Sequence, residues 1–110
     1  MTIDLAIHTN AIDISSFQST SFQAIWTGNP TGVITIEASL SLTNPDQLSD
    51  PLGLLWSDIG ASIPNQPSGC PGSTYVPVYA SCAKWLRLTY TNTPTSEMGQ
   101  LSVVAMSKTR

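Results

Sequence analysis

Few side chains in this sequence are able to take part in acid–base or nucleophilic chemistry. The chain has one histidine, His8, two cysteines and seven acidic residues. A nucleophilic site needs a serine, threonine or cysteine together with a base and a group that orients the base. His8 follows an apolar segment near the beginning of the chain, beside Thr9 and Asn10, where a solvent-exposed or intersubunit histidine is the simpler interpretation. The sequence therefore does not indicate a catalytic triad.

The acidic residues do not form the pattern that glycoside hydrolysis requires, which is a pair of carboxylates flanking a cleft. Most of them lie in segments with turn character, and only Glu37 lies within a clear strand pattern. Asp46 and Asp50 bracket a polar turn that suggests a calcium site with Asp58, but the spacing matches no EF-hand loop. Capping or turn-forming acids are the simpler interpretation. We expect no catalytic site, no metal site and no cofactor, and hence a protein that is not an enzyme.

The two cysteines, Cys70 and Cys82, flank a segment rich in Pro, Gly, Ser and Tyr. A disulfide between them would close a short loop and would stabilise the fold by about 3 kcal/mol in the chain-entropy model. A protein folded in a reducing cytosol would instead keep both thiols free. Zinc would require further Cys or His ligands nearby, and His8 is far away in the sequence. The disulfide and the two free thiols are alternatives at this point.

Charged residues are unusually scarce. They make up 10% of the chain, against about 25% in average proteins, and Ser, Thr, Asn and Gln take their place. A net charge of −3 with four cationic residues cannot supply the basic stripe that duplex nucleic acid requires. The first residues lack the basic and apolar regions of a secretory signal, and no segment has the roughly 18 apolar residues of a membrane span. We expect a protein made in the cytoplasm that binds neither nucleic acid nor a membrane.

The pattern of apolar residues indicates a single β-rich domain spanning residues 1–110. A chain of 110 residues is long enough for one hydrophobic core. Strand patterns recur between turn signals, and helical periodicity is not sustained anywhere. We predict an all-β fold, a two-sheet antiparallel sandwich that is jelly-roll-like and has seven to eight short strands. The strand patterns cover residues 3–7, 11–17, 21–27, 32–42, 76–79, 84–91 and 99–108.

Two pairs of these segments are separated by turn sequences. A Gly-Asn-Pro-Thr-Gly turn separates 21–27 from 32–42, and a segment rich in Thr, Pro and Ser separates 84–91 from 99–108. We expect each pair to form a β-hairpin. Residues 43–62 have a looser pattern that predicts either a turn of helix or a brief strand.

Alternation along the second strand of the first pair places four apolar side chains on its core face and Glu37 on the outer face. These core positions are Ile34, Ile36, Ala38 and Leu40.

The three tryptophans are expected to have different roles. Trp26 is in phase with apolar neighbours and is expected in the core, and Trp56 follows two leucines and is expected to close one end of the core. If the leucines of the strand around Trp85 face inward, then Trp85 and Arg87 stand together on the outer face. Tryptophan beside arginine is typical of protein interfaces, and this pair is our candidate interface. The alternative is that Arg87 pairs with Glu37 across the sheet.

The stretch 21–39, the Trp-Ser-Asp-Ile-Gly sequence at 56–60 and the strand 84–91 resemble segments of small β-sandwich virion proteins of tailed bacteriophages. In those proteins an Ile-Gln-x-x-Trp-Thr-Gly-x-Pro-x-Gly phrase precedes a strand and an Asn-Trp-Thr-Asp phrase follows it. A Tyr-Val-Arg-Leu-x-Tyr strand then closes the core. The resemblance covers most of the chain after residue 12. The positions that match are structural: Trp26, Gly28, Gly32, Trp56, Arg87 and Tyr90.

The resemblance implies a structural virion component, most similar to the jelly-roll decoration, cement or staple proteins that clamp neighbouring capsomers on the capsid exterior. It implies that the partner is the major capsid protein and that the chain is a homo-oligomer, a dimer or trimer, on the capsid. Residues 48–55 and the loop 70–82 depart from the shorter family forms, so contacts in these segments do not carry over. The second hypothesis is a carbohydrate- or receptor-binding module of a phage tail or fibre, which would use exposed aromatic side chains.

Overall fold

The computed structural model describes residues 6–15, 19–50, 54–79, 83–93 and 99–108, which form two antiparallel sheets. The five-stranded sheet contains β1 (Ala6–His8), β2 (Ile12–Asp13), β4 (Gly32–Ser39), β5 (Ser57–Asp58) and β7 (Trp85–Asn92). The three-stranded sheet contains β3 (Ser19–Gly28), β6 (Gly72–Tyr79) and β8 (Gly99–Lys108). A short 3-10 helix, η1 (Pro45–Gln47), lies between β4 and β5.

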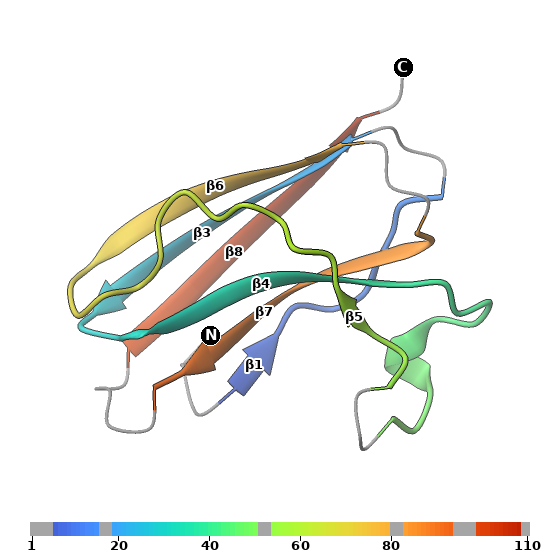
Figure 1. Cartoon of the computed structure of the whole chain (residues 1–110), viewed down its shortest axis with the longest axis horizontal. Helices are drawn as coiled ribbons and strands as arrows, with labels where there is room; N and C mark the ends of the chain where they lie inside the picture. Colours follow the sequence, from blue (N-terminus) through green and yellow to red (C-terminus); the bar gives the residue numbers. More distant parts are fainter. Residues whose placement is uncertain (1–5, 16–18, 51–53, 80–82, 94–98, 109–110) are drawn as a thin grey trace.

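The strand order is β1-β7-β4-β5 in one sheet, where β2 also pairs with β7, and β6-β3-β8 in the other. Figure 1 shows β3 between β6 and β8, and β7 between β4 and β1. The chain passes from one sheet to the other at most connections, including those between β3 and β4, β6 and β7, and β7 and β8. Such crossings are typical of jelly-roll-like sandwiches. The prediction of an all-β, two-sheet antiparallel sandwich is confirmed.

Both expected hairpins are wrong. β3 pairs with β6 and β8, whereas β4 pairs with β7 and β5, so β3 and β4 belong to different sheets, as do β7 and β8. The turn after β3 is held by the loop that precedes β6, since the Gly69 N–H donates to the Pro30 oxygen and Thr31 bridges to Ser68. β3 and β4 each have one strongly apolar face, and placing the strands in opposite sheets lets these two faces bury each other.

The core lies between the two sheets and is built from alternate residues of the long strands. Leu40, expected in the core, is 73% exposed because β4 ends one residue earlier. Burial of each large apolar side chain contributes roughly 1.5–3 kcal/mol. The core cluster is Ile14, Phe22, Ala24, Trp26, Ile34, Ile36, Val76, Val78, Leu86, Leu88, Tyr90 and Leu101.

The N-terminal strand predictions are met in part. The expected strand 3–7 overlaps β1, and the expected strand 11–17 contains β2. The remaining expected positions at 3–5 and 16–17 lie outside the described residues.

Candidate functional site

The outer face of the five-stranded sheet carries a buried ionic network around Arg87. Its Nε donates a hydrogen bond of 2.8 Å to Oε1 of Glu37, the residue directly opposite on β4. The Thr89 hydroxyl donates to the same oxygen at 2.6 Å. The guanidinium group also lies 4.3 Å from the ring centre of Trp56. The Arg87 and Glu37 side chains are 13% and 21% exposed, so this network is largely covered although it lies on the outer face of the sheet.

Trp85 stands on the same outer face and is also covered. It is 9% exposed, and its indole N–H donates to the Ser41 oxygen at 2.8 Å. The Nζ atom of Lys84 lies 5.5 Å from the ring centre. The residues that cover this face come from the chain between β4 and β5, which contributes both Ser41 and Trp56.

The expected outward direction of Trp85 and Arg87 therefore agrees with the burial pattern of β7, and the alternative pairing of Arg87 with Glu37 is present in the structure. A role of Trp85 and Arg87 in an interface stays a prediction. Trp26 is buried in the core as expected, and its indole N–H donates to the Cys70 oxygen. The expectation for Trp56 is wrong, because it packs on Arg87 outside the core instead of closing one end of the core.

A polar hollow of about 530 Å³ lies beside this network and is lined in part by His8, Asp46, Asp50 and Arg87. Its carboxylates are already engaged by the backbone. Asp46 accepts the N–H of residue 11, and Asp50 accepts the N–H groups of residues 54 and 55. Asp58 accepts the N–H of residue 60. The bonds of Asp50 and Asp58 are local and are the turn-forming roles that the sequence favoured, whereas the bond of Asp46 joins two distant segments. Within the described ranges no three His, Cys, Asp or Glu side chains gather as a metal site.

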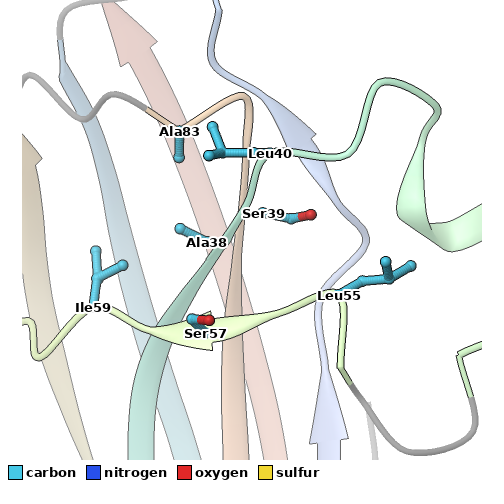
Figure 2. Close-up of a pocket in the computed structure, with 7 residues that line it drawn as sticks. All are labelled: Ala38, Ser39, Leu40, Leu55, Ser57, Ile59 and Ala83. Atoms are coloured by element: carbon cyan, nitrogen blue, oxygen red, sulfur yellow. The ribbon is translucent and has the colours of Figure 1, made fainter.

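A second hollow, of about 450 Å³, lies where β4 and β5 meet. Figure 2 shows Ala38 on β4 with Leu40, Ile59 and Ala83 around it, whereas Leu55 points away. Its lining contains apolar and serine side chains and no charged one. The hollow therefore offers apolar contact without a group that would orient a charged ligand.

The outer face of the three-stranded sheet is different because its side chains remain open to solvent. Four large side chains point outward from its three strands, namely Ile25 (45% exposed), Tyr75 (56%), Val104 (59%) and Met106 (63%). Serine, threonine and glutamine side chains lie between them, and a hollow of about 350 Å³ runs past Tyr75, Val104 and Met106. Lys108, at the end of β8, is the charged residue described on this face.

This neutral face was not predicted from the sequence. Period-two alternation places Ile25 on the face opposite Phe22, and Tyr75 on the face opposite Val76, but it does not show which strands lie side by side. Bringing β6, β3 and β8 side by side required the tertiary structure.

Among the described residues, two ionisable groups have shifted pKa values, and both have structural roles. Burial raises the pKa of Tyr90, whose hydroxyl donates to Oδ1 of Asn92 at 2.7 Å. Hydrogen bonds from Ser15, first from its hydroxyl and then from its N–H, lower the pKa of Asp13. His8 is exposed, and its Nδ1 lies 2.8 Å from the oxygen of the next residue.

The cysteine alternatives remain open. Cys70 is exposed with a free thiol at the loop before β6, and Cys82 lies outside the described residues. The disulfide and the two free thiols therefore both stay predictions.

Comparison of the chain with family models, with curated proteins and with solved structures gives no match. In the part of the chain that the structure describes, no helix is long and apolar enough to cross a membrane. A functional assignment therefore rests on the surfaces described above and on the resemblance of the sequence segments.

Proposed function

We propose that this protein is a capsid decoration protein of a tailed bacteriophage, which binds the outside of the major capsid protein shell and stabilises it. The observation that carries the proposal is the neutral open face of the three-stranded sheet. Docking such a face requires little desolvation of charge, which is the costly part of burying a polar surface. Interface centres are typically depleted of charge and enriched in Tyr and Met, as at Tyr75 and Met106.

The two broad faces of the sandwich differ in a way that suits attachment. The five-stranded sheet has its outer face covered in part by the chain's own residues, since Trp56 packs over Arg87, although Val33 on that face is 53% exposed. The large outward side chains described on the three-stranded sheet are all open to solvent. Each copy would then bind through one sheet and present the covered sheet outward. Many weakly bound copies on a shell suffice for stabilisation, because linked attachment sites raise residence without high single-site affinity.

The test is a sedimentation assay with mature capsids that lack the protein, followed by heating of the loaded particles. We expect co-sedimentation at a fixed ratio per capsomer and a higher temperature of capsid disruption. The variant I25K/S73K places two charges opposite each other on the neutral face and is expected to abolish binding. The matched control V33K/T91K does the same on the other sheet and is expected to bind normally. The proposal would be refuted if the wild-type protein did not bind capsids that lack it.

The second candidate, a carbohydrate- or receptor-binding module of a tail or fibre, is supported by one observation. Tyr75 is open to solvent, and its hydroxyl lies 2.9 Å from that of Ser21 beside the hollow on this face. The tryptophans do not help this candidate, since Trp26, Trp56 and Trp85 are 2%, 7% and 9% exposed and offer no open ring face. Glycan binding that disappears in Tyr75→Ala, with the fold intact, would favour it over decoration.

A further inference from the structure

The sheet edges of this protein are protected unequally. An edge strand exposes unpaired N–H and C=O groups, and proteins normally shorten, cover or interrupt such strands. On the five-stranded sheet, β2 and β5 have two residues each, and the described part of β1 has three. On the three-stranded sheet, β6 contains Pro77, and Asn65 covers this strand by donating from its side chain to the Ser73 oxygen. Three of the edges thus have a recognised form of protection.

The edge formed by β8 has none of these features. β8 is ten residues long, contains no proline and pairs with β3 alone among the described strands. Over residues 102–108 no described residue bonds to its outer edge. Val104 and Met106 are more than half exposed, and Ala105 is exposed although it points to the inner side of the sheet. An uncharged open strand of this kind is suited to pairing with another strand.

We propose that β8 is the site where two copies of this protein pair with each other. The strands run antiparallel about a two-fold axis at Ala105, so that two three-stranded sheets join into one six-stranded sheet. In this register Val104 of each copy lies opposite Met106 of the other. Directly opposite side chains in antiparallel strands have Cβ atoms about 4.5–5.5 Å apart, so the apolar groups cover one another.

The charge distribution of β8 favours a second copy in the antiparallel direction. Lys108 is the charged residue of the strand, and in the proposed register it faces Ser102. The two lysines then stand about 20 Å apart along the ribbon, whereas parallel pairing would place them side by side. Like charges directly opposite each other destabilise a sheet.

The pairing is expected to be weak in solution and independent of any capsid. A contact between two edges of seven residues is smaller than the roughly 1,200 Å² of a stable complex. Pairing leaves the outer face of the sheet open, so that two copies would present one continuous neutral face. Since the mass of the free protein reports on pairing, failure of the capsid assay would leave this inference intact, and the reverse also holds.

The test is sedimentation equilibrium of the free protein from about 10 μM to about 1 mM. The wild-type mass is expected to rise with concentration from 11.7 kDa towards twice that value. V104K/M106K places lysines opposite lysines across the two-fold axis and is expected to remain a monomer throughout. An equimolar mixture of V104K/M106K with V104E/M106E is expected to form the pair again, at least as tightly as wild type. The control V33K/T91K carries the same added charge on the other sheet and is expected to pair normally.

Three results would overturn the inference: a wild-type protein that is monomeric over the whole range, a V104K/M106K variant that associates like wild type, or charge variants that do not pair when mixed. Both substituted side chains are more than half exposed, so circular dichroism should show intact folds. A readout without substitutions is amide hydrogen exchange of the wild type. Slower exchange within residues 102–108 at high concentration is expected, and no change there would contradict pairing through β8.

Discussion

Replacement of Arg87 by methionine tests whether this residue stabilises the fold or serves only as a contact for a partner. Methionine keeps an apolar stem of similar length and removes the charge. The variant loses the hydrogen bond from Nε to Glu37 and the contact with the Trp56 ring. It leaves the Glu37 carboxylate, which is 21% exposed, with the Thr89 hydroxyl as its remaining side-chain partner among the described residues.

The expected loss of stability is about 2 kcal/mol. A hydrogen bond to a charged group contributes roughly 1.5–3 kcal/mol, and a cation–π contact adds about 0.5–1 kcal/mol. The partial exposure of Arg87 and Glu37 to solvent and the packing that methionine retains make the expected loss smaller than the sum of these two contributions. For a domain of this size the loss corresponds to a fall in Tm of about 8 °C. Glu37→Gln keeps an acceptor oxygen, so we expect a smaller loss of about 1 kcal/mol.

The assay is urea unfolding of wild type, R87M, E37Q and the double variant, with a coupling energy of about 1 kcal/mol expected from the cycle. Added salt should reduce the difference in unfolding free energy between wild type and R87M, because salt screens the ion pair between Arg87 and Glu37. Lys84→Met is the matched control. Its partner, Asp13, is 4.0 Å away and the pair is partly exposed, and the Lys84 Nζ lies 5.5 Å from the Trp85 ring centre. A change of less than about 1 kcal/mol is therefore expected, smaller than that for R87M. An R87M variant as stable as wild type, with no coupling to Glu37, would refute the structural role.

Three further outcomes are expected. Because burial raises the pKa of Tyr90, the contribution of this residue to stability is expected to be constant below the unfolded-state value of about 10 and to fall as pH rises beyond it. Y90F should remove that part of the alkaline loss. It should also lower stability at neutral pH by about 1–2 kcal/mol, because Asn92 loses its donor. Urea unfolding between neutral and alkaline pH measures both effects. Gly32→Ala is expected to destabilise the fold by about 3 kcal/mol, since the added Cβ would overlap the Thr91 backbone oxygen and the Tyr90 ring. A melting temperature equal to that of wild type would contradict this. Two titratable thiols per chain are expected without reductant. The extended β6 between Cys70 and Cys82 has eight residues and spans about 26 Å, whereas a disulfide holds the two Cα atoms within about 7 Å. A count of zero free thiols in the denatured protein would show a disulfide.

The strand content and much of the core followed from local patterns. Residues such as Phe22, Ile36 and Leu88 alternate with polar neighbours, and an extended chain sends alternate side chains to opposite faces. Their burial was therefore predictable without knowing which strands pair. The candidate partners of Arg87 were also limited in advance, because Glu37 is the only acid in a long strand.

Strand pairing was not predictable in the same way. Two consecutive strands show the same alternation of apolar and polar residues whether they pair in a hairpin or cross between sheets. The sequence on either side of Pro30 therefore fits both arrangements. The loop contact from Gly69 to Pro30 favours the crossing and joins residues distant in sequence. The long strands that pair with β3 and β4, namely β6 and β8 for one and β7 for the other, are distant in sequence as well. The role of Trp56 was missed for the same reason, since its contact is the distant Arg87.

The sequence by itself determined that this chain has an all-β fold and few charged residues, because composition and period-two alternation are local properties. Only the tertiary structure decided which side of each sheet is covered. Burial of Trp85 and Arg87 depends on the chain between β4 and β5 folding back over its own sheet. Tyr75, Val104 and Met106 are exposed because no described segment folds over the outer face of the three-stranded sheet. These are long-range outcomes of packing, and they place the neutral face and the open edge of β8 next to each other.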